Sequence, residues 1–537
     1  MRGPDQNPNA SHSHAPWPIL CTRGMMELEQ QNHLERFLKW AAKLGISDSS
    51  TNTVEPEIPV SSCLGHTLSV SNFPDAGGRG LAAVRDLRKG ELILRVPKSA
   101  LLTRENLLKD ENLSLTVKKH ASLSSSQILA VCLLAEMDKG KSSCCYPYLM
   151  QLPRSYGLLA SFGQCEMQAL QVEDAIWTAE KAALKVKLEW EEASALMQKL
   201  RIRPQLQTLK AWVWAFATIS SRTLHIPWDD AGCLCPVGDL FNYAPPGDET
   251  YDFGDLGTQM HASSLRVGSF GNGQATGKSD LEQFDAQEQR LIDAGYEEDV
   301  AAYCFYARKY YKRGEQVLLS YGMYTNLDLL EHYGFLLNEN PNEKVFIPLE
   351  PDIYSFSSWS NDSMYIKGNG KPSFALLSAL RLWAAPPRQR RSVGHLAYSG
   401  SQLSTENEIC IMNSILEKCH IILKNLPTSF EEDSLLLCGV NKMQDLCSPV
   451  ELKKVLSDFK GELHTFFETY CLQSGEGGTK LDLSEKTRSS IDRWKLAVQW
   501  RMRYKEALLD CIVYCSEIID RLSCQNIQTG MDNLVLR

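Results

Sequence analysis

Two tyrosines within residues 314–335, which read GEQVLLSYGMYTNLDLLEHYGF, have the residue type and the neighbours that chemistry could use. Tyr321 and Tyr333 are each followed by a glycine, which lets a ligand or another backbone approach closely. A tyrosine ring adds an apolar surface that carries one polar hydroxyl. The pattern indicates either a pocket or, with equal support from this stretch alone, a buried strand and helix whose rings pack together.

A glycine-rich turn at residues 77–80 (GGRG) is a second candidate. Dinucleotide and P-loop fingerprints need a helix directly after the glycines, whose N-terminus faces the phosphates. Here the strand pattern continues, and the chain contains no G-x-x-x-x-G-K-[ST]. Phosphate binding is therefore disfavoured. The turn is either a plain hairpin turn or a loop whose missing side chains let the backbone lie against a small cofactor.

Nucleophilic hydrolysis has little support. The chain contains no G-x-S-x-G motif, and His225 and His332 stand alone, as packed or surface histidines do. Asp239 followed by Asn242 could form a carboxylate and carboxamide pair in a polar pocket. A capped turn ahead of the two prolines that follow is the simpler interpretation of these residues.

The elements that position these residues follow from hydrophobic periodicity. Residues 26–45 have helical spacing, and strands joined by glycine turns are predicted from residue 60. The pattern is helical after residue 102 and returns to strands near residue 235. A Gly/Ser-rich stretch at 254–280 is predicted to be a mobile loop, and a strand is predicted at 302–310. Further helices are predicted at 127–137, 174–200 and 206–221, and then at 373–384, 406–423, 449–468 and 484–522. The predicted fold class is α+β, with a β-rich unit split by a helical insert and followed by an α-helical domain.

Composition narrows the possible partners. The 537 residues are 43% hydrophobic and 23% charged, with a net charge of −9, which disfavours a general nucleic-acid binder. No apolar run approaches the roughly 18 residues that span a bilayer, so no membrane partner is predicted. Seventeen scattered cysteines, many in apolar segments, indicate a reduced, intracellular protein. Cys144–Cys145 and Cys233-x-Cys235 lack a second ligand pair at zinc spacing, so no metal is predicted.

The order of the motifs adds a family resemblance. GRGL, RKGELILRVP, YPYLMQLP, SSRTL, VGDLFNY and the 314–335 stretch together resemble the SET-domain protein methyltransferases of the Rubisco large-subunit methyltransferase-like class. The resemblance covers about residues 60–522. It implies a SET domain at 60–340 with its insert at about 103–225. Ahead of it, polar, Pro/Asn/His-rich composition predicts a disordered tail at 1–25, and periodicity predicts an N-terminal helix and linker at 26–59. A helical substrate-binding domain is then expected at 345–530.

The resemblance also implies a site for S-adenosylmethionine. Tyr321 matches the family's main catalytic residue, and Tyr333 matches the second tyrosine, which lines the channel for the target side chain. Tyr243 stands where the family's Asp-x-x-Asn-His motif has histidine, so the backbone contact is kept while the imidazole packing is lost. The positions expected to bind the cofactor are Gly77, Gly78, Arg79, Gly80, Arg222, Asp239, Asn242, Tyr243, Tyr321 and Asn326.

The activity implied is protein-lysine N-methylation, on a non-histone protein that the C-terminal helical domain docks. A lysine with a pKa near 10.4 must first lose a proton, which costs about 4–5 kcal/mol at pH 7, so a dry channel that favours the neutral amine fits the chemistry. Protein-histidine methylation and a degenerate protein-binding module, the latter suggested by Tyr243, are the alternatives. We expect a monomer in the cytoplasm or nucleus, with weaker support for a plastid.

Overall fold

The structure is a computed structural model that describes residues 23–49, 62–74, 77–109, 111–120, 122–246, 294–356, 358–444 and 485–535. The predicted loop at 254–280, the predicted helix at 449–468 and residues 1–22 of the predicted tail lie outside these ranges. Helix α1 (Arg23–Lys43) begins three residues before the start of the helix predicted at 26–45. A helix can propagate past its apolar face once it is nucleated, which is why the pattern placed its start too late.

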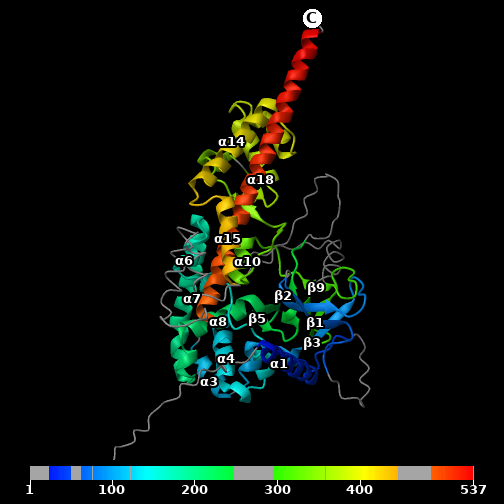
Figure 1. Cartoon of the computed structure of the whole chain (residues 1–537), viewed down its shortest axis with the longest axis vertical. Helices are drawn as coiled ribbons and strands as arrows, with labels where there is room; N and C mark the ends of the chain where they lie inside the picture. The colour runs from blue at the N-terminus through cyan, green and yellow to red at the C-terminus, as the bar shows by residue number, and fades with distance from the viewer. Residues whose placement is uncertain are drawn as a thin grey trace, which may run out of the picture.

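Three small sheets form the β-rich unit, at the blue and green end of the ribbon in Figure 1. The first sheet has the order β1-β2-β9-β6, the second the order β3-β8-β7, and the third pairs β4 with β5. Their bounds are β1 (Leu68–Phe73), β2 (Gly78–Ala83), β9 (Gln316–Leu319), β6 (Asn242–Tyr243), β3 (Leu92–Pro97), β8 (Ala302–Tyr306), β7 (Gly295–Glu297), β4 (Thr223–Ile226) and β5 (Asp229–Leu234). The strand predicted at 302–310 is therefore shorter. It ends because residues 307–311 turn to pair with residues 87–91.

A helical insert separates β3 from β4 in the chain. Its helices are α2 (Arg104–Leu107), α3 (Glu111–Lys118), α4 (Ser125–Lys139), α5 (Tyr146–Leu149), α6 (Gln164–Gln168), α7 (Glu173–Lys199) and α8 (Leu209–Arg222). Helix α4 begins at a capping box in which the Ser124 and Gln127 side chains each accept from the other residue's backbone N–H. Helix α8 is capped by Thr208, whose side chain accepts from the N–H of Ala211, and it ends at Arg222. The end of the helix therefore places Arg222 beside the sheets.

The C-terminal half is almost entirely helical. It contains α10 (Asn326–His332), α11 (Pro351–Phe356), α12 (Phe374–Ala384), α13 (Arg390–Tyr398), α14 (Thr405–Asn425), α15 (Phe430–Gln444), α18 (Glu485–Val535) and the short pair β10 (Lys344–Val345) and β11 (Ile366–Lys367). The predicted α+β class, with a β-rich unit split by helices and followed by a helical domain, is confirmed. Over the described residues, no helix is both long and apolar enough to cross a bilayer.

Helix α18 connects the two halves of the molecule. Figure 1 shows it running from the insert helices to the far end, where α14 packs beside it. Trp494 and Val498, near its start, lie in the core that contains the sheets and the insert, while Leu508 and Cys515 lie in a second core with α12 and α14. The helix runs to Val535, beyond the apolar periodicity that predicted an end at residue 522.

Candidate active site

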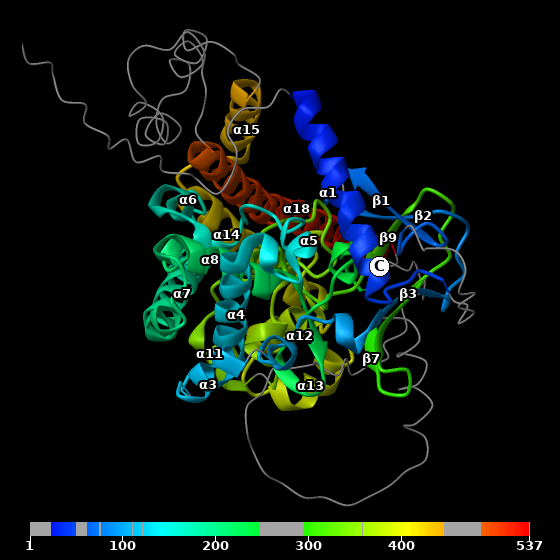
Figure 2. The ribbon, with the colours of Figure 1, turned by 90° about the horizontal axis from the view of Figure 1, so that it is seen from below.

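Strand order places the predicted site residues at one end of the first sheet. Strand β2 runs antiparallel to β9, with Leu81 opposite Val317, while β6 runs parallel to β9, with Tyr243 opposite Leu319. The start of β2, strand β6 and the end of β9 therefore meet. In Figure 2, β1, β2 and β9 lie together beside α1. This arrangement brings the glycine turn, Asn242 and the loop after β9 together from segments that are far apart in sequence.

Four tyrosines and one phenylalanine form an aromatic box at this end of the sheet. The Tyr321 ring lies between Tyr243 and Tyr333, with both centroid distances at 5.1 Å, and Tyr324 meets Tyr333 at 5.4 Å. Phe335 closes the group, 6.0 Å from Tyr243 and 6.1 Å from Tyr333. The structure thus brings together Tyr321 and Tyr333, which the sequence singled out. All but Tyr243 keep part of their surface exposed, so another side chain can reach them.

The hydroxyl groups of Tyr321 and Tyr333 in the box form hydrogen bonds and are protonated at neutral pH. Tyr321 donates to the carbonyl of Phe241, and the Tyr333 hydroxyl lies 3.4 Å from that of Tyr324. Burial raises the pKa of Tyr321 well above its ordinary value, although Arg222 opposes this change. Burial likewise raises the pKa of Tyr333, with a further rise from Tyr324. Both phenols therefore stay protonated at neutral pH and can act as hydrogen-bond donors and oriented dipoles, not as phenolate bases.

Asn326 holds the backbone that follows the box. Its side chain, which is only 2% exposed, accepts from the N–H of Leu337 at 2.9 Å and donates to the carbonyl of Leu337 at 3.2 Å. The residue that caps α10 is Thr325, whose hydroxyl forms a capping box with Asp328. Gly334 lies against Gly157 of the insert so closely that a Cβ on Gly334 would lie 2.8 Å from backbone carbon. This contact explains the glycine after Tyr333.

A buried ion pair supports the other side of the site. The Arg222 Nη1 lies 3.1 Å from the Asp239 carboxylate, which also accepts from the Tyr148 hydroxyl at 2.9 Å. Burial lowers the pKa of Arg222, but Asp239 and the phenols of Tyr156 and Tyr148 outweigh burial, and the pKa is raised. Arg222 is therefore a permanent cation. Within the described part of the chain, its Nε is a buried donor that has no hydrogen-bond partner.

The glycine turn lies directly against Asn242. A Cβ on Gly80 would lie 2.7 Å from the Asn242 Nδ2, and a Cβ on Gly77 would lie 3.0 Å from the same amide group. Gly77 and Gly78 have φ values of +95° and +75°, which other L-residues adopt only with strain. The turn is a hairpin turn, since β1 pairs with β2 from Phe73 to Gly78. The missing side chains let the turn lie against the Asn242 amide, so the hairpin-turn interpretation of GGRG is confirmed, while the cofactor-loop interpretation stays a prediction.

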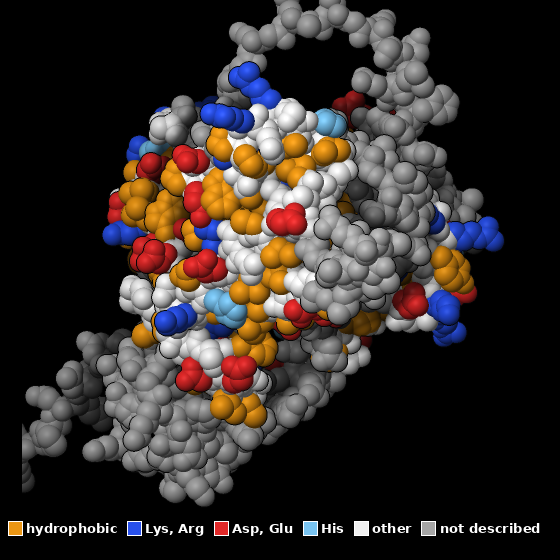
Figure 3. Space-filling model, turned by 90° about the horizontal axis from the view of Figure 1, so that it is seen from above, with side chains coloured by type: hydrophobic (Ala, Val, Ile, Leu, Met, Phe, Trp, Pro, Cys, Tyr) orange, Lys and Arg blue, Asp and Glu red, His pale blue; other side chains and the backbone are white. Residues whose placement is uncertain are grey.

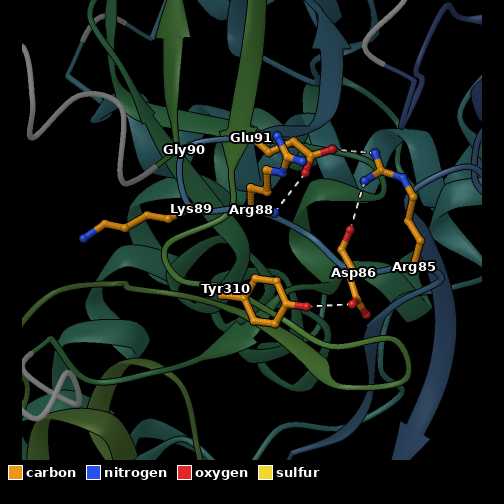
Figure 4. Close-up of a pocket in the computed structure, with 7 residues that line it drawn as sticks. All are labelled: Arg85, Asp86, Arg88, Lys89, Gly90, Glu91 and Tyr310. Carbon is orange, nitrogen blue, oxygen red and sulfur yellow. Dashed lines mark hydrogen bonds and ion pairs between the residues drawn. The ribbon is translucent and has the colours of Figure 1, made fainter.

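Two other groups of residues contain possible ligand atoms but lie outside the candidate active site. Arg85, Tyr310 and their neighbours line an open hollow of about 730 Å³, which lies past the far end of β2 (Figure 4). Its carboxylates are already engaged, since Asp86 accepts from Tyr310 at 2.6 Å and Glu91 pairs with Arg85 at 2.5 Å.

The second cluster contains Glu136, Cys144 and Cys145, whose possible ligand atoms lie within 4.8 Å of one another. The Glu136 oxygens already accept from Lys139 at 2.7 Å and Ser143 at 2.6 Å. Burial raises the pKa of the Cys145 thiol to about 12, so this thiol is protonated at neutral pH. We assign no metal to this cluster.

Comparison with known proteins identifies the family. The chain is 52% identical over 504 residues to Protein SET DOMAIN GROUP 40 of Arabidopsis thaliana, covering 93% of this chain and 98% of that protein. The chain belongs to the SET-domain protein methyltransferases of the Rubisco large-subunit methyltransferase-like class. A family described as Rubisco LSMT substrate-binding matches residues 327–508. These comparisons confirm the family predicted from the motifs.

More distant relatives agree in fold. The actin-histidine N-methyltransferase of Danio rerio is 26% identical over 408 residues, which cover 69% of this chain and 60% of that protein, less than two thirds of its length. Among solved structures, the SET domain of LSMT bound to lysine and AdoHcy has a TM-score of 0.50 at 16% identity, covering 92% of each chain. Rubisco LSMT bound to AdoMet has a TM-score of 0.50 at 17% identity, covering 91% of this chain and 93% of that chain.

Several residues of this SET-domain site were not singled out by the sequence. Tyr148 and Gln151 belong to the YPYLMQLP motif, which carried the resemblance without a role for either side chain. Gln151 accepts from the Arg79 guanidinium at 2.8 Å, which turns that side chain toward the insert. Tyr156 accepts from Thr218 at 3.0 Å beside Arg222. In the sequence, the one feature that points to Tyr324 is its position between Tyr321 and Thr325. None of these pairings can be read from spacing, since they join the insert to the sheets.

Glu343, a partly buried carboxyl beside Asn326, predicts a pH dependence of stability. Burial raises the pKa of the Glu343 carboxyl to about 7. Hydrogen bonds from the N–H groups of Asn326 and Lys344 lower the pKa and oppose this rise. Since the folded-state pKa exceeds the unfolded value of 4.5, the stabilising effect of the neutral carboxyl is complete below pH 4.5 and is lost as the pH rises through 7. We expect Glu343→Gln to gain stability over the wild type between pH 5 and pH 8, by up to about 3 kcal/mol.

Urea unfolding at pH 5 and at pH 8 measures this difference. The control is Glu339→Gln, an exposed carboxylate nearby, for which the change in stability should be equal at the two pH values. A Glu343→Gln variant whose stability relative to the wild type is the same at both pH values contradicts the assignment.

Proposed function

We propose that this protein is an S-adenosylmethionine-dependent protein-lysine N-methyltransferase. The observation that supports this most directly is the aromatic box around Tyr321, which lies at the same end of the sheet as the glycine turn and Asn242. An aromatic box of neutral, partly exposed rings suits the lysine side chain, because its amine must lose both its proton and its hydration water before it reacts. The lysine bound to a related fold, and the methyltransferases among the relatives, agree with this proposal.

The residues present fit the proposed cofactor. S-adenosylmethionine supplies a methyl group on a positively charged sulfur, which an amine displaces directly. The unpartnered Nε of Arg222 is positioned for the carboxylate of an amino-acid ligand, since a guanidinium fork binds a carboxylate through two donors. Gly77 and Gly80 leave room at Asn242 where a side chain would collide with its amide. Asp239 holds the arginine and, being 3% exposed, would act on the cofactor through it.

The box residues would act by positioning and by excluding water. A lysine amine enters as the neutral base only if it leaves its proton in solvent, and an aromatic, poorly hydrated channel favours the neutral form. The Phe241 carbonyl and the Tyr321 hydroxyl form a polar pair at the base of the box. Oriented dipoles of this kind can align a nitrogen lone pair with the transferred methyl group, so alignment supplies most of the rate.

The helical half is proposed to dock the substrate protein. The family match at residues 327–508 is described as substrate-binding. Several large apolar side chains in this half are exposed, including Phe346 at 47% and Phe374 at 48%. Figure 3 shows hydrophobic side chains interspersed with acidic and basic ones over the described surface. A mixed surface of this type suits protein contacts better than a nucleic-acid backbone. We also infer action inside the cell on a non-histone substrate, by a monomer.

The decisive test is transfer of label from S-adenosylmethionine labelled in its methyl group to a proteome extract. We expect wild-type protein to label a protein band that Tyr321→Phe does not label, and acid hydrolysis of that band to release methyl-lysine. Methyl-histidine would support the alternative favoured by the actin-histidine relatives. Absence of transfer together with absence of cofactor binding in a calorimeter would leave a protein-binding module.

Replacing Arg222 tests the cofactor site without any substrate. We expect Arg222→Met to weaken binding of S-adenosylmethionine at least about 100-fold, because a buried charge partner of the carboxylate is lost. The variant also loses stability, since Asp239 is left without its cation. In Arg222→Met/Asp239→Asn, stability should recover while binding does not. Arg104→Met, which breaks the 3.3 Å pair between α2 and Asp229 on β5, is the control and should bind normally in calorimetry.

A further inference from the structure

Tyr243 makes contacts that differ from those of the other tyrosines in the box. It is the most buried of them, with 6% of its surface exposed, and it lies on β6, next to Asn242. Its hydroxyl donates to the carbonyl of Gly322 at 2.7 Å. Gly322 belongs to the Tyr321 loop, which we define as residues 320–324, between the end of β9 and the Thr325 cap. The phenol therefore reaches across from one strand and holds the peptide that follows Tyr321.

The phenol is a donor at neutral pH, and its ring also packs on the loop. Burial raises the pKa of Tyr243 to about 12, so the hydroxyl keeps its proton and donates it to the Gly322 carbonyl. The Tyr243 ring adds contacts at 5.1 Å to Tyr321 and 6.4 Å to Tyr324. Backbone pairing of Tyr243 with Leu319 holds the start of the same segment.

The loop needs such a restraint because its own structure is weak. Residues 320–324 form neither helix nor strand, and Gly322 has a φ of +130°. Asn340 holds the Tyr324 carbonyl at 2.9 Å from the opposite side, and Tyr321 itself donates to Phe241. Between these points, the Gly322 carbonyl depends on Tyr243. Without that bond, the peptide after Tyr321 could rotate and carry the ring with it.

We propose that Tyr243 is a positioning residue that fixes the Tyr321 loop for methyl transfer, a role that rests on the proposed function. Because Asn242, the preceding residue, lies against the glycine turn, β6 connects the cofactor side of the site to the loop. The hydroxyl is the essential group. An imidazole is shorter than a phenol and cannot reach the Gly322 carbonyl in the same way, so histidine cannot replace the tyrosine in this chain.

The test uses Tyr243→Phe, which removes only the hydroxyl, in the full-length protein. Hydrogen exchange should rise about tenfold or more over the amides of the Tyr321 loop, because the Gly322 peptide loses its restraint, while the β9 amide of Val317 stays protected. With labelled cofactor and the extract substrate, kcat should fall about 10- to 100-fold, with KM and cofactor Kd unchanged, because a small misplacement of a reacting group has effects of this size. Tyr243→His should match Tyr243→Phe.

Tyr306→Phe is the matched control, since it loses a hydroxyl bond of 2.6 Å to Glu297 on β7, outside the box. It should leave both the loop exchange and kcat unchanged. Unaltered exchange of the loop amides in Tyr243→Phe, or full activity in Tyr243→His, would overturn the proposal. A loss confined to cofactor affinity would also overturn it. If wild type transfers no methyl group and the exchange difference is still observed, the proposed function fails while the restraint by Tyr243 stands.

Discussion

Replacing Asp433 with alanine is expected to lower the free energy of unfolding by about 3–5 kcal/mol, a large part of the total stability of a typical domain. Asp433 lies on α15 and is fully buried, with Arg501 at 2.7 Å and Lys505 at 2.5 Å, both on α18 and also buried. The variant removes the buried carboxylate that both buried cations share. Arg501 and Lys505 also donate to Ala169 and Gln171 of the insert, so this cluster joins the insert to the C-terminal helices.

Urea unfolding followed by tryptophan fluorescence measures the loss, with Glu431→Ala as the control. Glu431 is in the first turn of the same helix but is exposed, so its removal should change stability by less than about 0.5 kcal/mol. Adding Lys505→Met to Asp433→Ala should restore part of the loss, because one uncompensated charge is removed. A loss below about 1 kcal/mol in Asp433→Ala would show that the cluster does not hold the two halves together.

This cluster also shows what sequence patterns cannot predict. On a helical projection, Asp433, Arg501 and Lys505 resemble the charged residues of a solvated face, and charged residues are rarely buried without a partner. Their burial follows from α18 passing through two cores, which periodicity within one helix does not reveal. Helices α13 and α15 were likewise included only in a broadly helical region. Packing against α12 stabilises α13, and packing against α18 stabilises α15.

The fold class and most of the site were predictable for different reasons. Periodicity changes from strand to helix and back, and this alternation alone predicts a β-rich unit split by helices. The order of short motifs then identified the family and led to Tyr321, Tyr333, Arg222 and Asn242. The partners of those residues were not predictable. Tyr148 meets Asp239 across 91 positions of sequence, and no local pattern specifies such a pairing.

Tyr243 shows a limit of reasoning from a family motif. As a departure from histidine, it suggested a weakened cofactor site or an inactive protein. In the structure, the larger side chain is buried and hydrogen-bonded to the backbone of the Tyr321 loop. A substitution judged by what it removes can therefore mislead when the new side chain makes a contact that only the folded chain reveals.

The largest catalytic effect is expected from Tyr321→Phe, for which we predict a fall in the rate of methyl transfer of about 100- to 1,000-fold. The Tyr321 hydroxyl is the only atom removed, and it donates to the Phe241 carbonyl at the base of the aromatic box. The ring keeps its contacts with Tyr243 and Tyr333, each at 5.1 Å, so the shape of the box should survive. Loss of rate would then reflect loss of one oriented dipole beside the reacting atoms.

Calorimetry with S-adenosylmethionine and single-turnover transfer to the extract substrate separate binding from chemistry in this variant. Affinity for the cofactor should stay within about threefold of wild type, because Arg222 and the glycine turn are untouched. Tyr324→Phe is the matched control, since its hydroxyl lies 3.4 Å from that of Tyr333 and away from Phe241, and it should lose less than about tenfold in rate. If Tyr321→Phe transferred methyl groups as fast as Tyr324→Phe, Tyr321 could not be the residue that aligns the reaction. Catalysis would then have to be assigned to the shape of the box as a whole.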